Sequence, residues 1–295
     1  NATYESTELV IDVEPWESAV DGCEILDAIE ETLLNHVILP DRMATVISLW
    51  ILLTYCYDAF RVLAQLAICS PQKRCGKSTL LEAIQGLADK ALIASNISPA
   101  AVYRVIEKCK PTLLIDEADT HLKDNQELCG ILNSGHTRKT AFVIRVDVET
   151  LEPVRFSTWS PKVIALIGDL PDTQKDRSVV VSMRRKLPDE NIKKLTTAFD
   201  EDCLLIRQKC KRWAADNIET LRYSKPHIPQ TGNDRAEDNW STLLAIAETV
   251  GGHWPKKALE AMATSLEIHE EDDSIGVKLL VDIEQIFKDK NVEKI

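Results

Sequence analysis

The sequence is poor in aromatic residues, at 5% of the chain, and its eight cysteines include no C-x-x-C pair. Thiols scattered in this way exclude a disulfide framework and a zinc ribbon, and we expect them to be reduced in a cytoplasmic protein. Basic residues are outnumbered by acidic ones, 35 to 47, so the net charge is −12. This balance argues against a surface that is basic throughout, as in proteins that bind duplex, but allows a local basic channel.

The sequence also lacks an apolar run long enough to span a membrane. The longest, Met43 to Tyr57, has 15 residues and lies between Arg42 and Asp58, whereas a span needs about 20. We therefore expect a buried helix there and no membrane association. No signal peptide is visible. Because the chain begins at Asn1, we expect it to be a piece excised from a longer protein.

Apolar runs that alternate with helical patterns predict an α/β fold, with a mostly parallel sheet covered by helices on both faces. The expected strands are Val62–Ile68, Ala91–Ala94, Thr112–Ile115, Val163–Ile167 and Val179–Met183. A helix with Ser98 as its cap and Pro99 at its first position is expected up to Lys108. Residues 140–156 alternate in the manner of a β-hairpin.

Helical patterns dominate both ends of the chain. The expected helices are Gly22–Val37, the Met43 helix, Ile192–Trp213, Trp240–Val250, Lys256–Leu266 and Val277–Phe287. We therefore divide the chain into an N-terminal helical extension (1–60), an α/β core with a hairpin insertion (61–187) and a C-terminal helical lid (188–295).

A phosphate-binding motif connects the first strand to a helix. Residues 67–80 read Ala-Ile-Cys-Ser-Pro-Gln-Lys-Arg-Cys-Gly-Lys-Ser-Thr-Leu and contain the end of a Walker A motif. Successive backbone N–H groups at a helix N-terminus suit the clustered charge of a triphosphate. The residues expected to hold ATP are Pro71, Gln72, Lys73, Arg74, Cys75, Gly76, Lys77, Ser78 and Thr79. Pro71 replaces the first glycine of the motif and donates no N–H, so the opening turn must differ from the common one.

Two carboxylates follow the strand at Thr112–Ile115. Asp116 is expected to hold Mg²⁺ opposite the hydroxyl of Ser78, and Glu117 to orient the attacking water. Lys77 is expected to contact the β and γ phosphates. The alternatives are a chance Gly-Lys-Ser tripeptide and a solvated Asp-Glu pair that opens a helix. The combination of both motifs favours ATP hydrolysis.

Two arginines are candidates for contacts with phosphate. Arg177 follows the fourth apolar strand, where ring-forming ATPases place an arginine that reaches the neighbouring subunit's nucleotide. A surface salt bridge with Asp172 or Asp176 is the alternative. Arg184 and Arg185 are further candidates, and Arg235 is expected to contact phosphate within the same chain.

These residues resemble a P-loop family of phages, plasmids and genomic islands that is catalogued as domain of unknown function 3631. The motifs that carry the resemblance are Ser70–Ser78, Pro111–Asp119, Ile131–His136, Gly168–Thr173, Asp176–Ser178 and Asp234–Trp240. The resemblance spans residues 40–290 and extends more distantly to AAA+ replicative helicases of mobile elements. It implies an AAA+-like core, a helical lid, assembly into a homo-oligomeric ring and a primase-like domain or protein as partner.

The leading hypothesis is a motor that moves along DNA or unwinds it. Residues 136–162 hold five basic and three acidic side chains, above the acidic background, and we expect His136, Arg138 and Lys139 to contact single-stranded DNA. A charged, solvent-facing hairpin is the alternative. A second hypothesis is a regulatory ATPase that acts on proteins, which the net charge of −12 favours. A phosphotransferase is disfavoured by Glu117.

Overall fold

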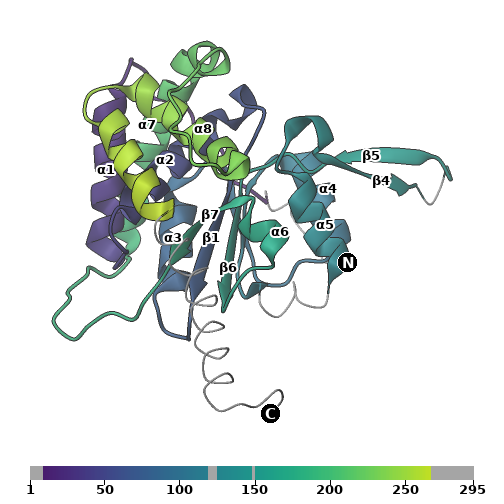
Figure 1. The fold of residues 1–295 in the computed structure, drawn as a ribbon, viewed down its shortest axis with the longest axis horizontal. Helices are drawn as coiled ribbons and strands as arrows, with labels where there is room; N and C mark the ends of the chain where they lie inside the picture. The colour runs from purple at the N-terminus through teal and green to yellow at the C-terminus, as the bar shows by residue number, and fades with distance from the viewer. Residues whose placement is uncertain (1–8, 119–124, 148–149, 267–295) are drawn as a thin grey trace, which may run out of the picture.

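Five parallel strands form one sheet in the computed structural model, which describes residues 9–118, 125–147 and 150–266 (Figure 1). The strand order is β2-β3-β6-β1-β7. Their bounds are β1 (Gln65–Ser70), β2 (Ala91–Ala94), β3 (Thr112–Ile115), β6 (Lys162–Ile167) and β7 (Ser178–Ser182). Because paired strands all run in one direction, the sheet has an amino end, where the strands start, and a carboxyl end, where they finish.

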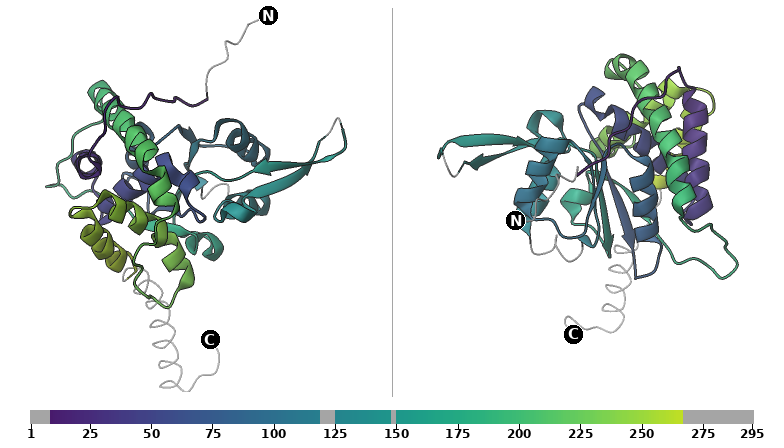
Figure 2. Two further views of the ribbon diagram at one scale, coloured as in Figure 1. Left: turned by 90° about the horizontal axis from the view of Figure 1, so that it is seen from above. Right: turned by 180° about the vertical axis from the view of Figure 1, so that it is seen from behind.

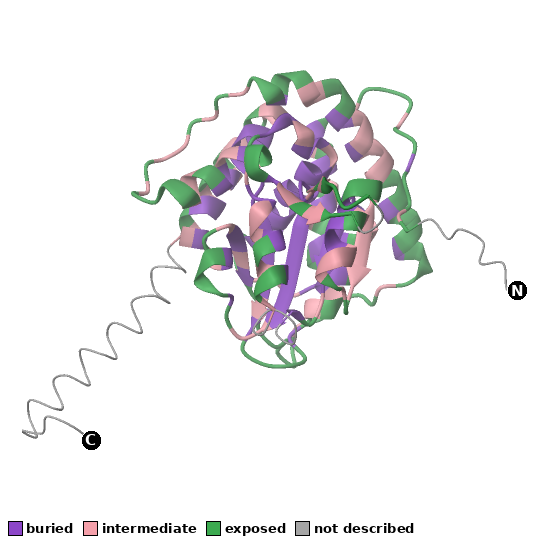
Figure 3. Ribbon diagram, turned by 90° about the vertical axis from the view of Figure 1, so that its right-hand side faces the viewer, coloured by how far each residue is buried: buried purple, intermediate pink, exposed green. Residues whose placement is uncertain are grey.

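Helices cover both faces of this sheet because successive side chains of a strand point to opposite faces and join two different apolar clusters. Leu66 and Ile68 of β1 belong to the cluster that includes α3 (Lys77–Leu87). Ala67 belongs to the cluster on the other face, with α4 (Pro99–Cys109) and α5 (Gln126–Ser134). Figure 3 shows the buried strands enclosed between helices whose outer surfaces are exposed. The α/β class expected from the sequence is confirmed.

The helices from the two ends of the chain pack together on the α3 face. They are α1 (Gly22–His36), α2 (Met43–Cys56), α7 (Thr197–Arg222) and α8 (Asp234–Val250), and residues 254–266 are also helical. α2 contacts α1, α7 and α8 and is buried on nearly every side. This confirms the expected buried helix. No helix in the described ranges has the length and apolar character that a membrane crossing requires.

A β-hairpin extends from the body of the protein (Figures 1 and 2). It consists of β4 (Phe142–Val146) and β5 (Pro153–Ser157) and is preceded by a short helix, η3 (Arg138–Thr140). Phe156 packs against Tyr103 of α4, with 4.8 Å between the ring centroids. The hairpin is thus anchored near its base, as the alternating pattern of residues 140–156 predicted.

Three elements differ from the sequence expectation by more than two residues. α8 begins at Asp234 rather than Trp240, because the side chain of Asn233 caps it there, and α7 continues to Arg222, past the expected end at Trp213. β1 starts at Gln65 rather than Val62, because Val62 forms an antiparallel bridge with Thr137 instead of joining the sheet. α7 starts at Thr197 rather than Ile192, because residues 188–196 form no helix and Lys193 donates its N–H to the carbonyl of Asn35. The expected helix Val277–Phe287 lies outside the described residues.

Two further short helices lie in the part of the chain that the structure describes: η1 (Tyr57–Ala59), which follows α2, and α6 (Asp172–Lys175). The chain leaves β1 through α3 toward β2, but leaves β6 through α6 toward β7 on the opposite side. A switch point of this kind opens a crevice at the carboxyl ends of β1 and β6, where ligands bind in open α/β sheets.

Candidate functional site

The loop between β1 and α3 (residues 71–76, hereafter the β1–α3 loop) lies at this switch point. Its last residue, Gly76, has a φ of 83°, which a residue with a Cβ adopts only at a cost. Arg74 also has a positive φ, 66°. The two left-handed residues curl the backbone just before α3 begins at Lys77.

The backbone amides of this loop have no protein partner. None of the N–H groups of residues 72–79 donates a hydrogen bond to any group in the described residues. α3 has no side-chain cap, whereas α1, α4, α5 and α8 are capped by Asp21, Ser98, Asn125 and Asn233. Free amides at a helix N-terminus form an electropositive, anion-binding surface.

The loop carbonyls face away from this surface. The carbonyl oxygen of Lys73 accepts hydrogen bonds from Nε and Nη2 of Arg185, both at 3.3 Å. The buried thiol of Cys75 lies 3.9 Å from the same oxygen. Arg185 lies three residues after β7, so the segment that follows the strand beside β1 contacts the loop through the carbonyl of Lys73. The sequence predicted Arg185 as a candidate for contacts with phosphate. Its contact with Lys73 could not be predicted, because no short-range pattern connects the two residues.

The side chain of Lys77 is directed back toward β1. Its Nζ donates to the hydroxyl of Ser70 at 2.6 Å, and that hydroxyl donates to the carbonyl of Gln72 at 2.9 Å. Ser70, the last residue of β1, therefore positions the lysine beneath the loop. The sequence gave no signal for this contact beyond the adjacency of Ser70 to the loop.

The two acidic residues reach the same pocket from β3. Asp116 accepts a hydrogen bond from the backbone N–H of Glu117 at 2.8 Å, and Glu117 has a φ of 52°. A pocket of about 440 Å³ brings them together with the loop. It is lined by Lys73, Arg74, Cys75, Gly76, Lys77, Ser78, Thr79, Asp116, Glu117 and Ile167. Pro71 and Gln72 lie outside this lining.

Two predicted site residues lie at the other end of the sheet. The carbonyl of Arg177 accepts from the N–H of Gln65, the first residue of β1. Burial lowers the pKa of Arg177, and the charge of Arg235 lowers it further. Arg235 therefore lies within electrostatic range of Arg177. Arg235 is not among the residues that line the pocket at the carboxyl end of the sheet, and its contact with phosphate in the same chain stays a prediction. Arg177 forms no salt bridge with Asp172 or Asp176 and instead donates to the carbonyl of Thr173.

The residues predicted to contact DNA do not share one environment. His136 is 3% exposed and bonded to Asn239 at 2.8 Å, so its predicted contact with DNA is not possible here. Arg138 is exposed but pairs with Asp58 at 3.3 Å and stacks on Trp159. Lys139 is exposed. All three precede β4, and the backbones of His136 and Arg138 bond to Leu63 and Arg61, in the segment before β1.

Comparison with known proteins supports the expected resemblance over the C-terminal part of the chain. The profile of the family described as "Protein of unknown function (DUF3631)" matches residues 182–295. The β1–α3 loop and the acidic pair lie outside this match. An "Uncharacterized 28.9 kDa protein in xis 5'region" of Saccharopolyspora erythraea is 30% identical over 110 residues, which are 36% of this chain. The match covers 41% of that relative's length.

Among solved structures, the apo A form of the NrS-1 C-terminal region is similar over 81% of this chain and 53% of that chain. The TM-score is 0.39 and the sequence identity is 15%.

Proposed function

We propose that this protein binds ATP with Mg²⁺ in the pocket between the β1–α3 loop and Asp116, and hydrolyses it. The observation that carries the proposal is the row of backbone amides at residues 72–79 that have no acceptor among the described residues. Most residues of this row are exposed, so a ligand can reach their N–H groups. A row of them at an uncapped helix, beside Lys77, suits a polyphosphate.

The oxygen atoms on the opposite side of the pocket are suitable ligands for Mg²⁺. The hydroxyl of Ser78 and the carboxylate of Asp116 both line it, and hard oxygen ligands are those that Mg²⁺ prefers. One oxygen of Asp116 accepts from the N–H of Glu117, which fixes the carboxylate and leaves its second oxygen for the cation. Bound Mg²⁺ would neutralise charge on the β and γ phosphates.

Glu117 supports hydrolysis rather than simple binding. It lines the pocket next to Asp116, and its left-handed backbone turns the chain immediately after β3. A second carboxylate beside the metal ligand can accept a hydrogen bond from the attacking water and orient it.

We infer that DNA is the substrate on which this hydrolysis acts, and that the protein is a helicase or translocase. Lys139 is exposed and belongs to η3, the short helix that precedes β4 of the projecting hairpin. A cation at such a position can contact a phosphate backbone.

A second candidate is an ATPase that remodels or regulates proteins, and the hairpin itself favours it. Ile144 and Val146 are 58% and 63% exposed. Their cross-strand partners are Arg155 and Pro153, so one face of the hairpin is largely apolar. Exposed apolar surface of this kind is typical of protein contacts.

Phosphate release from ATP, measured with and without single-stranded DNA at two salt concentrations, tests the proposal. We expect hydrolysis by the wild-type chain and stimulation by DNA that weakens at high salt and in Lys139→Ala. Hydrolysis that DNA leaves unchanged would favour the protein-directed alternative. Absence of ATP binding would contradict both.

A further inference from the structure

β7 lies at an edge of the sheet and pairs with β1 on one side only. The hydrogen bonds that flank this pairing involve residues of odd number. The carbonyl of Arg177 accepts from the N–H of Gln65, and the N–H of Met183 donates to the carbonyl of Cys69. The backbone N–H and C=O groups of successive strand residues point to opposite sides within the plane of a sheet. The residues of β7 with even numbers therefore direct these groups away from β1.

These outward-facing groups belong to Ser178, Val180 and Ser182. None of their N–H and C=O groups bonds to any group in the described ranges. Ser178 uses only its hydroxyl, which donates to the carbonyl of Gln174 at 2.7 Å. A row of unpaired backbone groups along a strand is a template on which a further strand can form.

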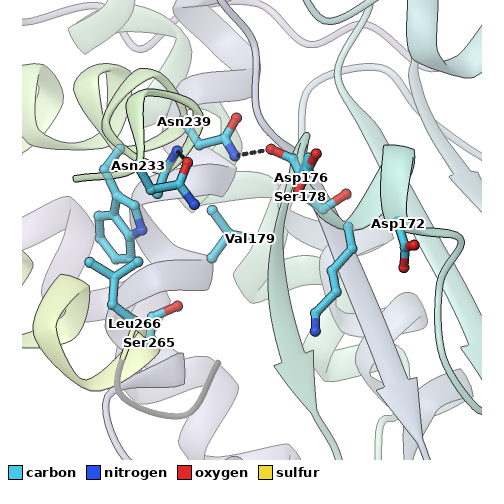
Figure 4. Close-up of a pocket in the computed structure, with 11 residues that line it drawn as sticks. Asp172, Asp176, Ser178, Val179, Asn233, Asn239, Ser265 and Leu266 are labelled. Atoms are coloured by element: carbon cyan, nitrogen blue, oxygen red, sulfur yellow. Dashed lines mark hydrogen bonds between the residues drawn. The ribbon is translucent and has the colours of Figure 1, made fainter. Parts of the chain in front are cut away.

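A slot of about 400 Å³ adjoins this edge (Figure 4). Ser178 and Val179 lie on its β7 side, and Asn239 of α8 and Leu266 lie on the opposite side. Asn239 joins the two sides, because its Nδ2 donates to the carbonyl of Asp176 at 3.0 Å. The slot is thus bounded by an unpaired strand edge on one side and by helices on the other.

This arrangement determines what kind of group fits the slot. α8 and the helix of residues 254–266 stand opposite the edge of β7, so the folded sheet of a second copy has no room to pair with it there. Further along, Val180 is half-buried and Ser182 is exposed, so the edge is accessible beyond the slot. The occupant that fits is a single extended segment, which adds to a sheet edge through main-chain hydrogen bonds.

The chain itself supplies a segment that starts at the slot. Leu266 lines the slot and is the last residue that the structure describes, and residues 267–295 follow it in the sequence. An extended run of the length of residues 267–276 spans about 33 Å, whereas the five residues of β7 span roughly 17 Å. The residues after 276 are therefore within reach of either end of β7.

Residues 277–283 have a sequence that suits a strand. Val277, Leu279, Val281 and Ile283 recur at every second position, and three of these four residues are β-branched. The same residues also fit the helix expected from the sequence. A helix pairs its own backbone groups, however, and only an extended segment offers partners to the edge of β7.

We propose that residues 277–283 pair with the outer edge of β7 as a sixth strand of the sheet, with Leu266 and the slot at their side. Ser178, Val180 and Ser182 then gain backbone partners, and the edge is closed to strands of other proteins. The segment is that of the same chain, because Leu266 already lies at the slot. This inference does not depend on nucleotide binding, so its failure would leave the proposed function unaffected.

Hydrogen–deuterium exchange of single backbone amides in the full chain tests the proposal. We expect the N–H of Val180 to exchange at least 10-fold more slowly in the wild type than in Leu279→Asp, because a charge at an apolar position removes the segment from the slot. Lys278→Gln, which changes a neighbouring polar position, is the matched control and should exchange like the wild type. The N–H of Val181 faces β1 and should be equally protected in all three proteins, which excludes a general loss of stability.

Three results would overturn the proposal. The first is exchange of the Val180 amide in the wild type at the rate of an unpaired amide. The second is slow exchange that Leu279→Asp leaves unchanged, since another part of the protein would then cover the edge. The third is protection of Val180 that increases with protein concentration, which would assign the segment to a second copy.

Discussion

The ammonium group of Lys77 lies 2.6 Å from the hydroxyl of Ser70, which in turn donates to the carbonyl of Gln72. The lysine is therefore held at the base of the β1–α3 loop by the last residue of β1. With Arg185 bound to the carbonyl of Lys73 from the opposite side, the loop amides are left facing the pocket. Under the proposed function, the loop already has the shape in which its amides would receive the phosphates.

Glu117→Gln should leave ATP binding intact and lower the rate of hydrolysis. The amide keeps the shape of the side chain but cannot act as a base, and loss of such a group costs on the order of 10²- to 10⁴-fold. Phosphate release and equilibrium nucleotide binding, measured together, check this expectation. Glu82→Gln, at an exposed position on α3, is the control. Equal hydrolysis by Glu117→Gln and the wild type would exclude a catalytic role for Glu117.

Asn239→Leu should destabilise the fold. Asn239 is buried, and its removal leaves Nε2–H of His136 and the carbonyl of Asp176 without partners. Each unpaired buried group costs about 1–3 kcal/mol. Urea unfolding should show the loss as a lower midpoint, whereas Asp238→Asn, an exposed neighbour, should change little. An unchanged midpoint for Asn239→Leu would show that the amide does not hold α8 to the turn before β7.

The buried His136 predicts a loss of stability in mild acid. Burial lowers the pKa of His136 in the folded protein, and the charges of Arg177 and Arg235 lower it further. Below about pH 6.5 the unfolded chain therefore binds more protons, and the free energy of unfolding falls by up to about 1.4 kcal/mol per pH unit. His136→Gln should flatten this dependence between pH 6.5 and 5. If both proteins lose stability equally across that range, the effect does not come from His136.

Lys162 predicts that stability continues to rise with pH on the alkaline side. It is 1% exposed, its Nζ donates to the carbonyls of Thr158 and Ser160 at 2.8 and 2.9 Å, and burial lowers its pKa to about 7. An unfolded lysine keeps its proton to about pH 10.4, so between pH 7 and 8.5 the unfolded state binds more protons. The free energy of unfolding should rise with pH, by about 2 kcal/mol at most. Lys162→Met should lack this rise, and an identical slope in both proteins would contradict the prediction.

The sequence was sufficient for features that depend on short-range patterns. The Gly76-Lys77-Ser78 motif and the Asp116-Glu117 pair each follow an apolar strand, and parallel strands bring their carboxyl ends together. The cap of α4 by Ser98 could be predicted in the same way, because capping depends on adjacent residues.

Features that depend on tertiary packing could not be predicted in this way. Arg235 is an exposed residue of α8, and its nearness to Arg177 depends on the packing of α8 against α2 and α7 and on the bond of Asn239 to the carbonyl of Asp176. The burial of His136 follows from the same contact. Gly135 is required because a Cβ there would lie 2.2 Å from Nζ of Lys162, a strand residue that the sequence gave no reason to expect in the core.

The most direct test of the account is calorimetric titration of the wild-type chain and of Lys77→Ala with Mg²⁺ and a non-hydrolysable ATP analogue. We expect one binding site per wild-type chain, and a Kd at least ten times higher in Lys77→Ala, because the phosphates lose a charged hydrogen-bond donor. Lys108→Ala, at an exposed position on α4, should bind like the wild type. No binding by the wild type, or equal affinity in Lys77→Ala, would contradict the claim that the β1–α3 loop holds a triphosphate.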